Sequence, residues 1–222
     1  MKLVLYSVPV LALVVGLLIR AGILGRQQQL YVLKPLSTLL VIAVALLSLL
    51  QPVRNPSYTV GVTVGLVLSL GGDIALLFEE NRKAFALGLG LFLLAHVAYT
   101  VVFTLLGRVS AWDAVSAAVL LAAGVGFYAL VRSNLGKLRV PVIAYMLVIS
   151  VMVSRAAATL ASPSFSAAQT SMILVGALLF YLSDALLAAN RFWKPWRYRR
   201  IGLVPYYAGQ FLIALAASYF VS

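Results

Sequence analysis

The chain has 222 residues, of which 64% are hydrophobic and 10% charged, and its formal net charge is +12. A water-soluble globular domain does not have this composition, so the sequence predicts an integral membrane protein. The chain has no cysteine and one histidine, which excludes disulfides, thiolate chemistry and a three-histidine zinc site. We expect no cofactor and no resident metal, unless Asp side chains and backbone oxygens bind an ion.

Apolar runs of about 17 to 25 residues, long enough to cross a bilayer as helices, occur eight times. The alternating segments of about ten residues that mark transmembrane strands are absent. We therefore expect an all-α polytopic membrane protein, a bundle of eight transmembrane helices that forms a single transmembrane domain over residues 1–222. The predicted spans are 3–19, 35–50, 59–78, 84–106, 114–131, 140–160, 167–189 and 201–221.

The first two runs need separate arguments. Run 3–19 ends at Arg20 without the small-residue cleavage site of a signal peptide, so we keep it as a span. The second run is short, with Pro35 and Pro52 at its ends. Because proline is tolerated in the first turn of a helix, we interpret both prolines as helix ends and keep this span as well.

The third run contains Asp73, roughly 7 Å before the end of the run. Gly61, Gly65 and Ser69 precede it at intervals of four, and small residues at this spacing let a neighbouring helix approach closely. We therefore expect Asp73 to face protein, because a carboxylate exposed at the bilayer centre costs about 2.5 to 3.5 kcal/mol. One interpretation is structural: Asp73 and Asp184 hydrogen-bond across helices, or pair with loop cations, only to hold the bundle.

The fourth run contains His96, which we expect roughly 18 Å into the membrane, deeper than the aspartates. Phe92, His96 and Thr100 share one helix face, with Tyr99 nearby. A buried histidine that donates to a neighbouring helix is one interpretation, and a proton relay or a wall of the site is the other.

Polar side chains also gather at the start of the second, sixth and eighth runs, all at one end of the bundle. They are Lys34, Ser37, Thr38, Tyr145, Tyr206, Tyr207 and Gln210. Lys34 is either an interfacial anchor that snorkels to the surface or a cation for a phosphate group. The tyrosines are either part of a site or an aromatic belt.

The seventh run contains Asp184, directly after Ser183, whose hydroxyl can donate to it. Asp184 follows Asp73 by 184 − 73 = 111 residues, half of the chain, and Gly176 precedes Asp184 as Gly65 precedes Asp73. The offset suggests two parallel four-span halves, because four crossings return a chain to the same side. Chance recurrence in a leucine-rich chain is the alternative.

The basic residues predict the orientation. Loops one, three, five and seven hold most of the 17 Lys and Arg residues, whereas Lys2, Arg54 and Arg108 lie on the opposite side. The positive-inside rule places the basic loops in the cytoplasm and both termini on the extracytoplasmic side, and we expect a bacterial-type inner membrane. Topology thus accounts for the charge, and we expect membrane lipids and no nucleic acid as partners.

Six segments between residues 31 and 215 carry these polar residues. They are YVLKPLST, LGGDIALLF, GLGLFLLAHVAY, VIAYMLVIS, GALLFYLSDALLAANRF and YYAGQFLIA. In this order they resemble the YhhN/TMEM86 family of eight-span membrane proteins, and the GD, SD and KP motifs are the most specific part. The first span fits no motif of the family.

The resemblance implies lysoplasmalogenase activity, the hydrolysis of the vinyl-ether bond of a lysoplasmalogen to a fatty aldehyde and a glycerophospho-alcohol. By the family pattern, Asp73 and Asp184 are the catalytic carboxylates. The candidate substrate-binding residues are Lys34, Ser37, His96, Tyr99, Tyr145, Ser183, Tyr207 and Gln210.

The residues suit this chemistry. A vinyl ether is cleaved by protonation of the alkenyl carbon and capture of the oxocarbenium ion by water, and two carboxylates can share this work as general acid and as ionised partner. Lys34 would hold the phosphate of a lysophospholipid substrate. The residues also allow a small proton-coupled transporter or lipid flippase that uses the same carboxylates, or a non-catalytic lipid-binding protein. The head group, chain length and oligomeric state are left open.

Overall fold

The structure is a computed structural model that describes residues 2–196 and 199–220. Within these residues the chain is entirely helical and has no strand, which confirms the predicted all-α class. The eight α-helices are α1 (Lys2–Ile23), α2 (Gln27–Leu47), α3 (Pro56–Leu76), α4 (Arg82–Leu106), α5 (Ala111–Val131), α6 (Arg139–Ala158), α7 (Ala167–Phe192) and α8 (Leu203–Ala216).

Seven of the described helices, α1 to α7, are long and apolar enough to cross a membrane, so the chain is a multi-pass membrane protein. The eighth predicted span, 201–221, is shorter than expected, because α8 has 14 residues and follows a 3-10 turn, η5 (Arg199–Gly202). A helix of that length is about 21 Å long, less than the hydrocarbon core of about 30 Å. It lies among α1, α2, α3 and α7, so its neighbours shield most of it from lipid.

The helix starts follow local capping signals. Side chains of Asn55 and Asn81 accept hydrogen bonds from the first backbone N–H groups of α3 and α4. Ser110 and Ser166 begin α5 and α7 with capping boxes. Each cap satisfies N–H groups that have no partner within the helix, which explains why these starts lie within three residues of the predicted ones.

The start of α2 corrects one prediction. The helix begins at Gln27, so Pro35 lies inside it and is not a helix end. Proline leaves the carbonyl of Tyr31 without its helical partner, but this loss is tolerated in transmembrane helices that pack against neighbours. As a result Lys34 lies two turns inside α2 rather than at its surface end.

The helices form two halves with the same order of elements. A shift of 111 residues moves the bounds of α2 and α3 to 138–158 and 167–187, where α6 and α7 lie. Sequential helices pack in both halves, and across the halves α2 packs on α8 as α6 packs on α4. The internal repeat that the two aspartates suggested is therefore present in the fold.

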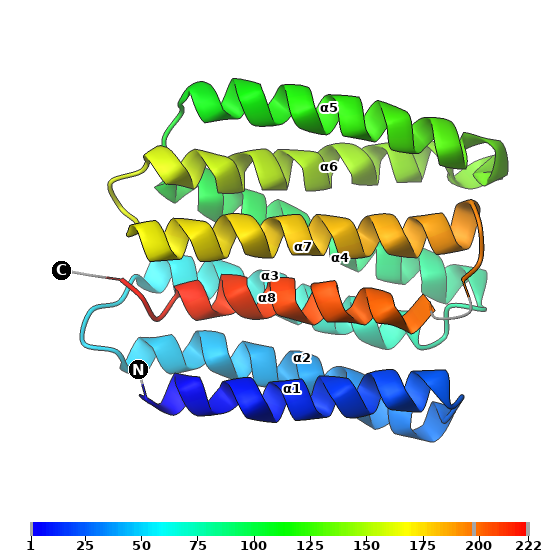
Figure 1. The fold of residues 1–222 in the computed structure, drawn as a ribbon, viewed down its shortest axis with the longest axis horizontal. Coiled ribbons are helices and arrows are strands. Elements are labelled where there is room, and N and C mark those ends of the chain that lie inside the picture. The colour runs from blue at the N-terminus through cyan, green and yellow to red at the C-terminus, as the bar shows by residue number, and fades with distance from the viewer. Residues whose placement is uncertain (1, 197–198, 221–222) are drawn as a thin grey trace.

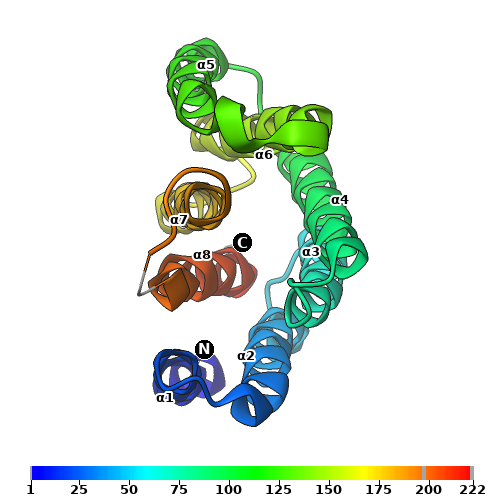
Figure 2. The same cartoon turned by 90° about the vertical axis from the view of Figure 1, so that its right-hand side faces the viewer.

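Seen end on, α2, α3, α4 and α6 form one curved layer, and α1, α8 and α7 form a second layer against it (Figure 2). Helix α5 lies at the edge of the bundle and packs mainly on α6. The start of α1 and the end of α8 lie at the same end of the molecule (Figure 1). The connections after α1, α3, α5 and α7, which carry the basic residues, lie at the opposite end.

Candidate active site

Asp73, on α3, is enclosed by side chains from α2 and α8. Its carboxylate is 1% exposed. The Nζ of Lys34 lies 3.2 Å from Oδ1, while Thr38 and Tyr206 donate to Oδ2 over 2.6 and 2.7 Å. Lys34 Nζ also donates to the backbone carbonyl of Asp73 over 3.2 Å. The carboxylate therefore has a cation and two hydroxyl donors.

Lys34 is 4% exposed, so the interpretation of this residue as a snorkelling anchor is wrong. This burial follows from the start of α2 at Gln27, which puts Lys34 two turns inside the helix. Its ammonium group is paired with Asp73, and its backbone carbonyl accepts a hydrogen bond from Tyr207 over 3.0 Å. The side chain still borders the cavity that contains Asp73.

Asp184, on α7, has different partners. Tyr145, on α6, donates to its Oδ2 over 2.5 Å, and Nε2 of His96 lies 3.6 Å from the same oxygen. The imidazole of His96 is fully buried and packs on the rings of Tyr145 and Phe180, at centroid distances of 5.3 and 4.6 Å. Asp184 thus faces one hydroxyl donor and one imidazole, and its side chain is 13% exposed.

The position of His96 beside Asp184 corrects the prediction that it lies deeper than the aspartates. Helical side chains tilt toward the N-terminus of their helix. Helices α4 and α7 run in opposite directions, so the side chains of His96 and Asp184 lean toward each other. A count of residues along each helix does not include this tilt.

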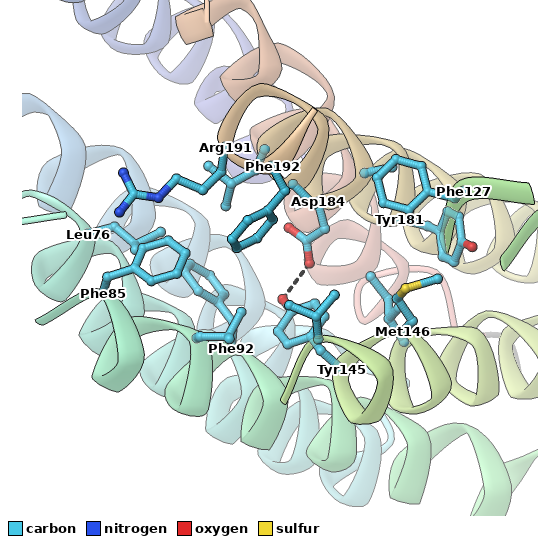
Figure 3. A pocket seen from close by; sticks show the side chains of 16 residues that line it. Leu76, Phe85, Phe92, Phe127, Tyr145, Met146, Tyr181, Asp184, Arg191 and Phe192 are labelled. Atoms are coloured by element: carbon cyan, nitrogen blue, oxygen red, sulfur yellow. Dashed lines mark hydrogen bonds between the residues drawn. The ribbon is translucent and has the colours of Figure 1, made fainter. Parts of the chain in front are cut away.

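Two cavities meet at Asp184. The polar cavity includes Lys34, Asp73, Asp184, Asn190 and Arg200 in its wall. The apolar cavity shares Asp184 with it and is otherwise lined mainly by apolar side chains. Figure 3 shows Asp184 and Tyr145 in the wall of the apolar cavity, among leucine, phenylalanine and methionine side chains. Four residues border both cavities: Leu76, Phe92, Asp184 and Leu187.

Five predicted residues line neither cavity: Ser37, His96, Tyr99, Tyr207 and Gln210. Tyr99 donates to Oε1 of Gln210 over 2.9 Å, and both side chains are buried. Ser37 donates to the carbonyl of Leu33 in its own helix, over 2.8 Å.

Ser183 lines the polar cavity but does not bond to Asp184 as expected. Its hydroxyl donates to the carbonyl of Gly202 over 3.0 Å, because successive residues of a helix point in different directions. Tyr145, Tyr206 and Tyr207 are 9%, 4% and 2% exposed, so they do not form a lipid-facing aromatic belt.

The family resemblance did not imply Thr38 and Tyr206, although both donate to Asp73. The sequence contained a signal for each. Thr38 lies one helical turn after Lys34, and therefore on the same face of α2, while Tyr206 directly precedes Tyr207 at the start of α8. Among the described residues, no group of three or more His, Cys, Asp or Glu side chains could hold a metal ion.

The sequence profile described as the YhhN family matches residues 29–217 of the chain. The match includes α3 to α7 in full, nearly all of α2, and α8. It therefore contains both aspartates and every side chain that contacts them. No solved structure matches this chain.

Proposed function

Because the chain belongs to the YhhN family, which includes lysoplasmalogenases, we propose that it hydrolyses the vinyl-ether bond of a lysophospholipid. The position of Asp184 between the polar and the apolar cavity carries the proposal. A lysoplasmalogen has the same division, since its vinyl ether joins one hydrocarbon chain to a glycerophosphate head. With the head in the polar cavity and the chain in the apolar cavity, the vinyl ether lies at Asp184.

We assign the general acid to Asp184. Its carboxyl proton goes to the second alkenyl carbon, the C=C electron pair forms the new C–H bond, and an oxocarbenium ion results. Water then adds to that ion and gives up a proton to the Asp184 carboxylate, which restores the acid. The hemiacetal collapses to a fatty aldehyde and the glycerol hydroxyl, so the net reaction consumes one water molecule.

Asp73 has the role of the ionised partner. Lys34, Thr38 and Tyr206 all stabilise its charged form through the contacts described above. An ionised carboxylate in the wall of the same cavity stabilises the positive charge of the oxocarbenium ion, as the second carboxylate of a glycosidase does. Tyr145 orients the Asp184 carboxyl group, and His96 is placed to exchange a proton with it.

The polar cavity also offers cations for the phosphate of the head group. Lys34 borders it from α2, and Arg200 borders it from η5. We assign the phosphate contact to these two cations together, and the guanidinium of Arg200 can bind a phosphate with two parallel hydrogen bonds.

The experiment is aldehyde release from a lysoplasmenyl phospholipid by purified protein in detergent. We expect Asp184→Asn to lose turnover by about a thousandfold or more, the range of general acid catalysis, with an unchanged melting temperature. Glu80→Gln, which alters an exposed acid in the α3–α4 connection, is the matched control and keeps full activity. Full turnover in Asp184→Asn would refute the assignment. If the wild type binds the lipid but releases no aldehyde, the hydrolase proposal is wrong and transport in proteoliposomes becomes the next assay.

A further inference from the structure

We propose that the hydrocarbon chain of the substrate enters the apolar cavity sideways from the bilayer, through a lateral window between α5 and α7. The window consists of Phe127 on α5, Met146 on α6, and Tyr181, Ala185 and Ala188 on α7. The identity of the lipid rests on the proposed function, whereas the window itself rests on the geometry of the cavity.

Stacked side chains, among them the exposed Arg191, cover the cytoplasmic end of the apolar cavity. The guanidinium carbon of Arg191 lies 4.9 Å from the centroid of the Phe85 ring, and Phe85 meets Phe192 edge to face at 6.4 Å. Both phenylalanines are buried. Figure 3 shows this group on the side of the cavity away from Phe127 and Tyr181. A hydrocarbon chain that entered there would have to break the stack.

The other walls differ in burial. Phe92, Tyr145 and Ile149, from α4 and α6, are buried and close the cavity toward the bundle interior. The five residues of the window are all only partly buried, as are Leu89 and Leu187 elsewhere in the lining. Helix α5 packs mainly on α6 and only weakly on α7, so the partly buried side faces the lipid between α5 and α7.

The chemistry of the window fits a hydrocarbon chain. None of its five residues is charged, and two of them are alanine. On α7, Tyr181, Ala185 and Ala188 are four and seven residues apart, which puts them on one helix face. The two alanines are the smallest side chains of the window and lie in its wall with the large rings of Tyr181 and Phe127.

Contacts at both ends of α5 frame the window. At the cytoplasmic end, Nδ2 of Asn134 donates to the carbonyl of Phe192 over 2.8 Å and ties the α5–α6 connection to α7. At the opposite end, Arg155 on α6 pairs with Asp113 on α5 at 2.5 Å. These contacts hold α5 and its connection to the neighbouring helices on both sides of the window.

Substitutions that narrow the window test the proposal. Ala188→Trp fills it from α7, and Met146→Trp fills it from α6. Leu182→Trp is the matched control, because Leu182 is 48% exposed on the same helix and lies outside the cavity. The substrates are a long-chain lysoplasmenyl phospholipid in vesicles and a water-soluble analogue with a four-carbon alkenyl chain, which can enter through the polar cavity.

We expect both window variants to lose at least tenfold in kcat/KM on the long-chain substrate and to change less than twofold on the short one. The control should match the wild type on both. An equal loss on both substrates, or no loss on either, would overturn the window. Thermal melting of each variant identifies a folding defect. If one window variant is destabilised, the result from the other window variant decides the test.

A second readout is independent of catalysis. A lysophospholipid with a photoreactive diazirine in its acyl chain should label Phe127, Met146 or Tyr181 in the wild type, and Ala188→Trp should remove this labelling. If the window is labelled while no vinyl-ether lipid is cleaved, the proposed function fails and the window stands. If aldehyde is released while the label lies elsewhere, the window fails and the function stands.

Discussion

The two halves of the molecule hold their carboxylates on the same scaffold but beside different partners. The offset of 111 residues that relates Asp73 to Asp184 also relates Lys34 to Tyr145. In each half, the residue on the second helix contacts the aspartate on the third: Lys34 pairs with Asp73, and Tyr145 donates to Asp184. At this equivalent position, Lys34 forms a buried ion pair with Asp73, whereas Tyr145 contacts a carboxyl group that borders two cavities.

The partners from the other half follow the same relation. Tyr207 on α8 and His96 on α4 are also 111 residues apart. Tyr207 donates to the carbonyl of Lys34, and His96 packs its ring on Tyr145. The first-half site thus pairs its carboxylate with a cation, whereas the second-half site has a titratable ring beside its carboxylate. The interpretation of the aspartates as bundle-holding residues suits Asp73 better than Asp184.

The largest effect should come from making the two sites alike. Tyr145→Lys places beside Asp184 the cation that Lys34 places beside Asp73. A paired Asp184 no longer donates a proton, so aldehyde release should fall by about a thousandfold or more. Tyr145→Gln, which is polar but uncharged, is the matched control and should retain clearly more activity. Equal activity in the two variants would show that charge at this position does not matter.

The next effect concerns the ion pair itself. Asp73→Asn leaves the ammonium of Lys34 buried without its carboxylate, and removal of one partner from a buried pair costs about 3 to 5 kcal/mol. Adding Lys34→Met should restore much of that loss, because a buried apolar side chain replaces the unpaired charge. Unfolding of the single and double variants in detergent measures the coupling. Strictly additive losses would mean that the pair contributes nothing beyond its separate side chains.

The sequence predicted the eight helices of the described residues and the approximate bounds of most of them, because hydropathy over a long window is a local property. It missed the start of α2 by eight residues and predicted a longer α8. It also predicted the repeat from the spacing of Asp73 and Asp184. It did not predict that Pro35 lies inside α2, because the packing that tolerates an internal proline is not local. The same limit applies to His96, which reaches Asp184 only through the opposite directions of two packed helices.

The prediction of site residues from the sequence was limited for the same reason, because it depends on how the helices pack. Thr38 and Tyr206 stood beside predicted residues in the sequence, but the choice among neighbouring polar side chains depends on helix rotation. Ser183 was predicted to donate to Asp184, but its hydroxyl donates to the carbonyl of Gly202 in the connection before α8. Sequence identifies the polar end of the bundle, and the helix rotations decide which side chains meet.

A smaller effect should come from the equivalent glycines of the two halves. A Cβ on Gly176 would lie 2.8 Å from the carbonyl of Gly209, which belongs to the backbone of α8, whereas a Cβ on Gly65 would lie 2.4 Å from the ring of Tyr99. Both Gly→Ala changes should cost about 1 to 3 kcal/mol of unfolding free energy, as overpacking does. We expect Gly176→Ala to cost more, because two helices must separate where in the other half only one ring must shift.

The control for this comparison is Gly126→Ala, on α5, where a Cβ meets nothing within 4 Å. It should leave the unfolding free energy within about 0.5 kcal/mol of the wild type. If Gly65→Ala proves the more costly of the two equivalent changes, the Tyr99 ring is held more rigidly than the backbone contact between α7 and α8.

The smallest effects should come from single hydroxyl groups, and they should differ in kind between the halves. Tyr206→Phe removes one donor from Asp73, which keeps Lys34 and Thr38, so we expect about 1 kcal/mol of lost stability and less than a threefold change in turnover. Tyr145→Phe removes the hydroxyl donor that orients Asp184, so about a tenfold loss of turnover should accompany little change in stability. Aldehyde release and melting temperature measured on both variants decide the matter. If Tyr206→Phe instead loses turnover and Tyr145→Phe loses stability, the roles assigned to the two carboxylates are reversed, and Asp73 delivers the proton.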